Sequence, residues 1–178
     1  MLSIKNLKDK RVHISNEVPV CLNLKQGNAL ALTGQNGSGK TTLLRIIVGI
    51  LESESVDELF VNHDFAYLPS QNALYLDLKV KDYTTDPLPF LKDPSNSMFI
   101  NELSSGQKRK LALSLFFKQN KSLWIMDEPT THLDKNAVDD FYQTIDNHCQ
   151  RGGGVLISTH DYSLPPFFKT YDLSSESI

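Results

Sequence analysis

The stretch "GQNGSGKT", residues 34–41, decides the fold class that the sequence predicts. It matches the pattern G-x-x-x-x-G-K-[ST], with Gly34, Gly39, Lys40 and Thr41 in the defining positions. Glycines at this spacing let backbone N–H groups curl around a phosphate, and the following helix adds the positive end of its dipole. Lys40 is expected to reach the β- and γ-phosphates of a nucleotide, and the Thr41 hydroxyl to bind Mg²⁺. The candidate phosphate-binding residues are Gly34, Gln35, Asn36, Gly37, Ser38, Gly39, Lys40, Thr41 and Thr42.

Three apolar runs that end in polar loops predict the sheet around this stretch. They are "ALALTG" (29–34), "SLWIMDEP" (122–129) and "GVLISTH" (154–160). Unbroken apolar runs of four or five residues fit strands that are buried on both faces of a parallel sheet. In such sheets ligands bind at the carboxyl ends of the strands, and all three polar loops lie there.

Helical patterns lie between these strands. One follows Lys40 and places four apolar side chains on one face: Leu43, Leu44, Ile47 and Ile50. A second follows Asp134, a residue type that caps helices, and carries Val138, Phe141 and Ile145 at helical spacing. The glycines of "RGGGV" (151–155) are expected to end it. Strands alternating with helices predict an α/β fold with a mostly parallel sheet, and we expect one domain over residues 1–178.

Composition limits the function classes. Of the 178 residues 40% are hydrophobic and 22% charged, which is ordinary for a globular chain. The net charge of −3 gives no support to nucleic-acid binding. Cys21 and Cys149 lack metal-ligand spacing, and we expect two reduced thiols. We also expect a chain that does not span a membrane, since no apolar run approaches the roughly 20 residues needed. We expect no signal peptide either, since the N-terminal "MLSIKNLKDKR" has no apolar core of the required length.

Acidic and polar residues at the other strand ends complete the candidate chemistry. Asp127 ends a buried strand, where its carboxylate can hold the Mg²⁺ water shell beside Thr41. Glu128 is suited to polarise the water that attacks the γ-phosphate, although such a pair often only starts a helix. His160 ends a neighbouring strand and can hold the γ-phosphate and the water, or be merely structural. Gln71, in "YLPSQN", carries a weaker signal of its own.

The stretch "LSSGQKRKLAL", residues 103–113, is a second candidate anion site. Its serine–glycine turn precedes a basic helix that carries Lys108, Arg109 and Lys110. Taken alone, Ser104 fits an ordinary helix N-cap. The alternative is a phosphate grip that uses the helix dipole.

The motif order "GQNGSGKTT", Gln71, "LSSGQ", "WIMDEP", "THLD", "STH" resembles the nucleotide-binding domain of ABC (ATP-binding cassette) ATPases, from about Leu2 to Asp161. The resemblance implies an ABC-type P-loop NTPase that hydrolyses ATP with Mg²⁺. Gln71 then senses Mg²⁺, 131–134 is the D-loop and His160 the switch histidine. Two cassettes pair head to tail in that family, most simply as a homodimer. Each signature therefore binds the γ-phosphate of the other subunit's ATP, through Ser104, Ser105, Gly106 and Gln107.

The sequence departs from the family pattern in several places. Residues 1–33 hold no Phe, Tyr or Trp to stack on adenine, and His13 is the nearest flat ring. Ser105 stands where glycine is usual, and His132 where a small residue is commoner. The interval 72–102 is short and interrupted by prolines, so we expect a reduced helical subdomain there. Those prolines are Pro87, Pro89 and Pro94. The segment between the P-loop and the Q-loop is also short, which predicts a trimmed β-rich arm.

We therefore expect the ATP-hydrolysing subunit of an ABC transporter, which drives separate integral membrane subunits. It is expected to lie peripherally on the cytoplasmic face of the inner membrane, or on the matrix face if mitochondrial. "LSSGQKRKLALSL", "SLWIMDEP" and "RGGGVLISTH" are similar to the heme-exporter ATP-binding subunit of cytochrome c maturation. Three alternatives stay open: a transporter with another cargo, a soluble ABC ATPase of the translation or DNA-repair type, and a cassette that binds ATP without turnover.

Overall fold

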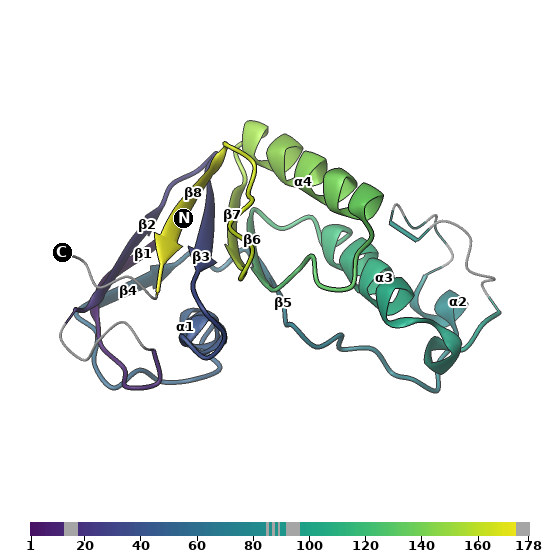
Figure 1. The fold of residues 1–178 in the computed structure, drawn as a ribbon, viewed down its shortest axis with the longest axis horizontal. Helices are drawn as coiled ribbons and strands as arrows, with labels where there is room; N and C mark the ends of the chain where they lie inside the picture. The colour runs from purple at the N-terminus through teal and green to yellow at the C-terminus, as the bar shows by residue number, and fades with distance from the viewer. Residues whose placement is uncertain (13–17, 85, 87, 89, 92–96, 174–178) are drawn as a thin grey trace.

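The computed structural model describes residues 1–12, 18–84, 86, 88, 90–91 and 97–173 (Figure 1). A parallel sheet forms the centre of the molecule. Its strands run in the order β5-β6-β7-β3-β8, and every neighbouring pair is parallel. They are β3 (Ala29–Thr33), β5 (Phe65–Leu68), β6 (Leu123–Asp127), β7 (Gly154–Ser158) and β8 (Phe168–Asp172). All residues of β3, β6 and β7 are buried, which confirms the three apolar runs as two-sided buried strands.

A second, antiparallel sheet has the order β2-β1-β4. Its strands are β1 (Leu2–Leu7), β2 (Val20–Leu24) and β4 (Glu58–Val61). Burial alternates along β2, since one face packs on the core while the other faces solvent. The loop between β1 and β2 begins with residues 8–12, which reach the phosphate-binding loop and so matter for the site.

Helices cover both faces of the parallel sheet. The helix α1 (Lys40–Ile47) packs between the two sheets, in one core with alternate side chains of β3, β6 and β7. The remaining side chains of these strands pack on α3 (Ser105–Phe117) and α4 (Lys135–Gln150). The expected cap is confirmed, because Asp134 accepts a hydrogen bond from the backbone N–H of Ala137.

One residue of the first helical pattern was placed wrongly. Ile50 was expected on the buried face with Leu43, Leu44 and Ile47, yet it is 58% exposed. The helix ends at Ile47, and Gly49 then takes a positive φ of 77°, which turns the chain away before Ile50 is reached.

The described residues of the interval 72–102 lie beside α3 and contain little regular structure (Figure 1). They form the four-residue helix α2 (Val80–Tyr83) and the 3₁₀ turn η1 (Ile100–Glu102). A small separate core joins them to α3. Pro87, Pro89 and Pro94, and also His13, lie outside the described residues. In the described part of the chain, no helix combines the length and apolar character needed to cross a membrane.

Candidate nucleotide site

The loop between β3 and α1 has the shape of a phosphate cradle. Gly37 and Gly39 take positive φ angles of 87° and 94°, and α1 begins directly at Lys40. The Lys40 side chain is buried and folds back over the loop, where Nζ donates to the carbonyl oxygens of Gly34 (2.6 Å) and Gln35 (3.0 Å). The ammonium group is thereby held above the N-terminus of α1, where an anion is favoured.

Glycine is required at position 39 for a second reason besides its φ. A Cβ there would lie 2.5 Å from the Cα of Val12 and 2.6 Å from the carbonyl oxygen of Arg11. Both contacts are with backbone atoms, which have little freedom to move. The segment after β1 is therefore packed directly against the phosphate-binding loop, and the antiparallel sheet contributes to the same site.

The ends of α1, β6 and β7 meet at a buried carboxylate. The Thr41 hydroxyl donates to Asp127, 2.9 Å from Oδ2 and 3.1 Å from Oδ1. The Ser158 hydroxyl donates to Asp127 Oδ1 at 2.5 Å. Asp127 and Ser158 are almost fully inaccessible to solvent. A hydroxyl and a carboxylate that face each other are hard oxygen ligands of the type that Mg²⁺ prefers.

Glu128 is held in an unusual backbone conformation. Its φ is 46°, in the left-handed region that is costly for a residue with a side chain. Its N–H donates to the Ser158 hydroxyl (3.0 Å) and, less directly, to the Ser158 carbonyl oxygen (3.2 Å). The Glu128 side chain meets His160, whose Nδ1 lies 3.0 Å from Oε2. The end of β7 and the residues just after it thus fix both the backbone and the carboxylate of Glu128.

A cavity of about 400 Å³ joins these groups. It is lined by Arg11, Asn36, Gly37, Gly39, Lys40, Thr41, Thr42, Ser70 and Glu128. Gln71 is exposed and follows Ser70, so the structure puts it at the rim rather than in the lining. The role given to Gln71 stays a prediction. Ser38 contributes a buried hydroxyl without a hydrogen-bond partner in the described structure, and that hydroxyl is available to a ligand.

The signature stretch forms the N-terminus of α3. Ser104 caps the helix: its Oγ accepts from the Gln107 N–H at 3.2 Å, while Gln107 Oε1 accepts from the Ser104 N–H at 2.9 Å. Ser105 is the first helical residue and is not among those with positive φ, so serine is accommodated where glycine is usual. A Cβ at Gly106 would lie 2.8 Å from the His132 carbonyl oxygen, so this glycine lets the helix approach the D-loop.

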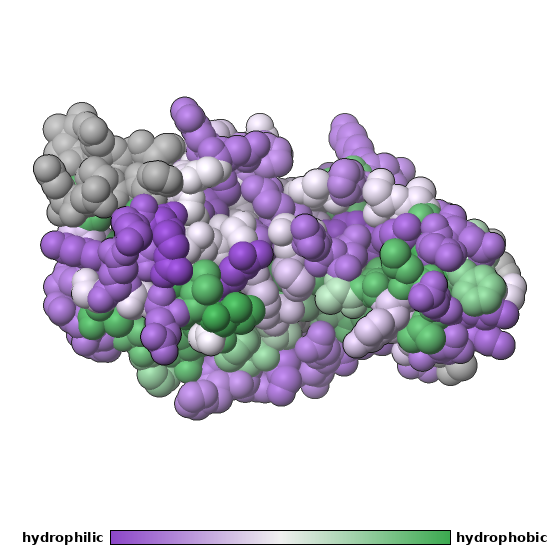
Figure 2. Space-filling view, turned by 90° about the horizontal axis from the view of Figure 1, so that it is seen from below, coloured by the Kyte–Doolittle hydropathy of each residue, from purple (hydrophilic) through white to green (hydrophobic). Residues whose placement is uncertain are grey.

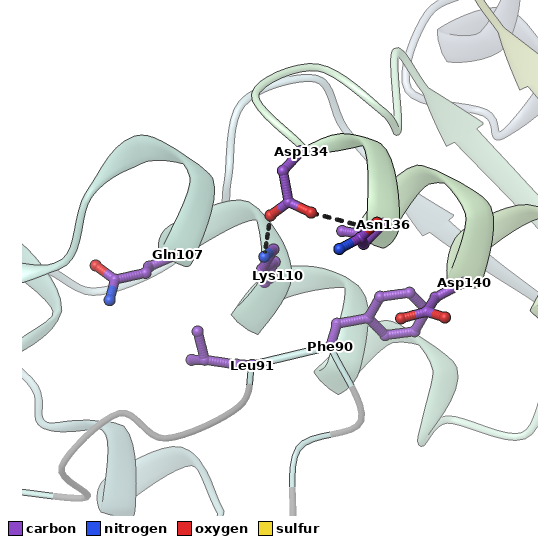
Figure 3. A pocket seen from close by; sticks show the side chains of 8 residues that line it. Phe90, Leu91, Gln107, Lys110, Asp134, Asn136 and Asp140 are labelled. Carbon is purple, nitrogen blue, oxygen red and sulfur yellow. Dashed lines mark hydrogen bonds and ion pairs between the residues drawn. The ribbon is translucent and has the colours of Figure 1, made fainter.

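A second contact ties the signature helix to the D-loop. Lys110 of α3 forms an ion pair with Asp134, the N-cap of α4 (Figure 3). The pair lies on a cavity of about 400 Å³ between the two helices, which Phe90 and Leu91 also line.

The signature does not reach its own chain's phosphate loop. None of its four residues lines the nucleotide cavity, and α1 and the start of α3 lie in different parts of the molecule (Figure 1).

Two residues that organise the site were not singled out from sequence. Ser158 connects both acidic residues, and its only sequence signal is its place two residues before His160. Arg109 was expected to add charge to a basic helix, but the whole residue is 1% exposed. Burial lowers its pKa to about 10, so the guanidinium stays charged at neutral pH. It donates to the carbonyl oxygens of Pro69, Pro129, Asp127 and Glu128 and to Asn72 Oδ1.

Known proteins match the chain along most of its length. The family model "ABC transporter" matches residues 18–131. The cytochrome c biogenesis ATP-binding export protein CcmA of Paracoccus denitrificans is 33% identical, over 93% of this chain and 85% of its own length. The protein of the same name from Agrobacterium fabrum is 32% identical, over 89% and 88%.

Solved structures agree with this assignment. An ATP-binding subunit of an ABC transporter superposes with a TM-score of 0.75 at 25% identity, covering 90% of this chain and 79% of its own. A dimeric bacterial ABC transporter cassette has a TM-score of 0.77 at 20% identity, covering 97% and 95%, and so supports the fold. The chain therefore belongs to the ABC transporter family and is an ATP-hydrolysing subunit of that family.

Proposed function

We propose that the cavity between the phosphate loop, Asp127 and Glu128 binds Mg²⁺–ATP and hydrolyses it within a head-to-tail pair of cassettes. The observation that carries this proposal is that polar side chains from three separate elements meet at the cavity. Thr41 is hydrogen-bonded to Asp127 at 2.9 and 3.1 Å, and His160 lies 3.0 Å from Glu128. Phosphoryl transfer needs positioning and charge stabilisation more than covalent chemistry from the protein, and this cluster offers both.

The residues present fit Mg²⁺. Thr41 Oγ1 and the Asp127 carboxylate are oxygen ligands, and Mg²⁺ usually combines one or two such groups with waters and substrate phosphates. When bound, the ion neutralises charge on the β- and γ-phosphates. Ser158 fixes one Asp127 oxygen at 2.5 Å, which leaves the other to turn toward Thr41 and the ion. Gln71, at the rim, is the remaining candidate to sense the ion.

Glu128 is proposed to polarise the attacking water. Its side chain is largely buried while that of His160 is 62% exposed, so the histidine covers the carboxylate from the solvent side. With ATP present, the same imidazole is placed to hydrogen-bond the γ-phosphate, and Glu128 is then released to accept a proton from water. Lys40 leaves its backbone carbonyl partners for the β- and γ-phosphates, which are stronger acceptors for an ammonium group.

The signature residues are proposed to act on a second subunit's nucleotide. Their position away from their own phosphate loop supports this, because a functional role for them then requires another chain. Ser104 and the Gly106 backbone lie at the positive end of a 13-residue helix, which favours an anion there. A head-to-tail homodimer would close two such composite sites. Each D-loop would lie beside the signature of its own chain, because Gly106 packs on His132.

An apolar surface near Gln71 is proposed to receive the membrane subunit. Among the described residues of the interval 72–102, four large hydrophobic side chains are exposed: Tyr75 (75%), Leu76 (51%), Leu78 (39%) and Phe99 (40%). Figure 2 shows apolar surface at the end of the molecule that carries α2. Aromatic and aliphatic side chains gathered in this way are typical of protein interfaces. We propose a cytoplasmic helix of an integral membrane subunit as the occupant.

The cargo is proposed from the relatives. Several are cytochrome c biogenesis ATP-binding export proteins, and the chain covers more than four fifths of their length. We infer an exporter for cytochrome c maturation, with heme as the transported group. The chain then works peripherally, on the cytoplasmic or matrix face of the membrane.

Affinity purification of the tagged chain from detergent-solubilised native membranes tests the partner and the cargo. Polytopic membrane subunits accompanied by heme-handling proteins are the expected result. Recovery of ribosomes or DNA-repair proteins instead would contradict the transporter role. Lys40→Ala tests the site itself: it should abolish binding of Mg²⁺–ATP by the purified chain, and wild-type affinity would remove the cavity from the mechanism.

A further inference from the structure

Arg11 lines the nucleotide cavity from the side of the antiparallel sheet. It follows β1, whereas Ser70 and Glu128 reach the same cavity from β5 and β6. Its position is fixed by its neighbours: Val12 is buried in the core, and the Arg11 carbonyl touches the space where a Gly39 side chain would be. Among the described residues that line this cavity, none is aromatic.

The Arg11 guanidinium is held in a fixed plane. Nε donates to Asp9 Oδ1 at 2.8 Å and Nη2 donates to Asp9 Oδ2 at 2.6 Å, the two-point geometry of an arginine–carboxylate pair. Nη2 also donates to the Glu52 carbonyl oxygen at 2.7 Å. The Asp9 side chain is fully buried, whereas that of Arg11 is 42% exposed. The hydrogen bond from Arg11 lowers the pKa of Asp9 to about 2, so the pair is ionised throughout the physiological range.

These hydrogen bonds occupy the edge of the guanidinium and use neither of its flat faces, and the side chain is partly exposed. Its partners lie in the plane of the group, since hydrogen bonds from a guanidinium run along its N–H directions. Its charge is already matched by a carboxylate, which weakens it as a phosphate ligand. What it still offers is a rigid, planar, polarisable surface, and arginine stacks on aromatic rings through such a surface.

We propose that the flat face of Arg11 is the surface on which the purine base of the nucleotide lies, with Asp9 as the positioning residue that holds it. This inference rests on the proposed function, because it assumes that the phosphates lie in the loop 34–41. It supplies the base contact for which the N-terminal segment has no Phe, Tyr or Trp. Stacking is largely indifferent to ring substituents, so Arg11 contributes affinity for purines rather than choice between adenine and guanine.

Binding measurements on the purified chain separate the base from the phosphates. Mg²⁺–ATP and Mg²⁺–tripolyphosphate share a phosphate chain, but tripolyphosphate has neither ribose nor base. Arg11→Ala should weaken ATP binding by about threefold to thirtyfold, the range of a cation–π contact. It should leave tripolyphosphate binding unchanged. Lys40→Ala should abolish the binding of both ligands, which distinguishes the base surface from the phosphate cradle.

Matched variants at position 11 test the planar shape of the side chain and its positive charge separately. Arg11→Lys keeps the charge without the planar group and should bind ATP more weakly than the wild type, because an ammonium group cannot stack on the base. Arg11→Tyr provides a flat ring and should bind ATP more tightly than Arg11→Ala does. The control is Lys10→Ala, which removes a neighbouring cation whose side chain is 75% exposed and paired with Glu54 at 3.2 Å. That variant should bind ATP as the wild type does.

The outcomes are distinguishable. An equal loss of ATP and tripolyphosphate binding in Arg11→Ala would overturn the proposal and leave Arg11 as a support of the loop. Full ATP affinity in Arg11→Lys would overturn stacking in favour of charge. A wild-type chain that binds neither ligand would contradict the proposed function itself. Photolabelling of the wild-type chain with 2-azido-ATP is independent of variant folding: the label is expected at residues 11–12, and labelling only elsewhere would overturn the assignment.

Discussion

The Arg109 guanidinium donates a 2.9 Å hydrogen bond to the carbonyl oxygen of Glu128, joining the signature helix to the backbone of the proposed general base. The same group donates to the Asp127 carbonyl oxygen at 3.0 Å and, on another side, to that of Pro69 at 3.0 Å. Glu128 carries a left-handed φ of 46°, and such a conformation persists only where its surroundings fix it. Arg109 is one of the groups that does so.

Arg109→Lys should therefore cost both stability and turnover. Lysine has a point charge and cannot replace a planar fork that donates to several carbonyl oxygens at once. We expect a loss of about 2–4 kcal/mol in the free energy of unfolding, since buried acceptors lose their donors. We also expect a lower kcat with a smaller change in KM. Denaturant unfolding and steady-state ATPase assays measure these quantities. Lys108→Arg, on the same helix, is the control, and equal effects in both variants would contradict the account.

Ser158→Ala removes the hydroxyl that contacts both acidic residues. Asp127 loses a donor at 2.5 Å and the Glu128 N–H loses an acceptor at 3.0 Å, while the backbone contact to Glu128 remains. We expect kcat to fall by about tenfold or more, since misplaced catalytic groups lose transition-state stabilisation. Ser114→Ala is a matched control, because Ser114 is also buried and hydrogen-bonded, to Phe90 and Lys110. It should lose stability without a comparable loss of turnover; similar kcat values in the two variants would argue against Ser158 as a positioning residue.

His148 makes stability depend on pH. Its ring stacks on Trp124, with centroids 3.6 Å apart and an interplanar angle of 5°, and burial lowers its pKa below the usual 6.5. The folded state therefore binds this proton less readily than the unfolded state does. The resulting stability is present above about pH 6.5 and is lost as the pH falls toward the folded pKa.

His148→Phe retains a flat ring beside Trp124 but cannot titrate. The slope of unfolding free energy against pH between 7 and 5 should be shallower in this variant than in the wild type. Urea unfolding at a series of pH values measures that slope. His63→Phe, which replaces an exposed histidine, is the control for introducing a phenylalanine. An unaltered slope in His148→Phe would show that another group dominates the pH dependence.

Much of the fold was predictable because its signals are local. The P-loop pattern fixes the β3–α1 connection, and the unbroken apolar runs identify strands buried on both faces. Asp127 was expected beside Thr41 because parallel strands end at one edge, and the two side chains do meet there. Ile50 was misplaced because the helical period was carried past Gly49, whose positive φ ends the pattern.

What sequence did not reveal depends on long-range contacts. Arg109 lies between two lysines and so reads as part of a basic face, and only the packed structure shows it buried against β5 and β6. The role of Arg11 likewise rests on Glu52, far along the chain, and on the fit of residues 11–12 against Gly39. Ser158 has no residue-type signal, because a serine that ends a strand is common. Each of these residues contacts at least one backbone atom of a distant segment, and such contacts leave no pattern in a sequence.

Glu128→Gln should uncouple ATP binding from hydrolysis. The amide is nearly the same size as the carboxylate but cannot accept the proton of the attacking water. We expect turnover to fall by about a hundredfold or more while ATP binding is retained. Gel filtration with Mg²⁺–ATP should then show a dimer, since the closed state is no longer released by hydrolysis. Turnover at the wild-type rate would remove Glu128 from the role of base.

The trans action of the signature is tested most directly by mixing two inactive variants. Lys40→Ala disables the phosphate loop and Ser104→Arg blocks the signature, so each homodimer lacks a complete site. A mixed dimer pairs the intact phosphate loop of one subunit with the intact signature of the other. The expected result is ATPase activity well above the sum of the separate variants, while Ser104→Arg mixed with the double variant Lys40→Ala, Ser104→Arg gives none. No gain on mixing, or full activity of Ser104→Arg alone, would contradict the account.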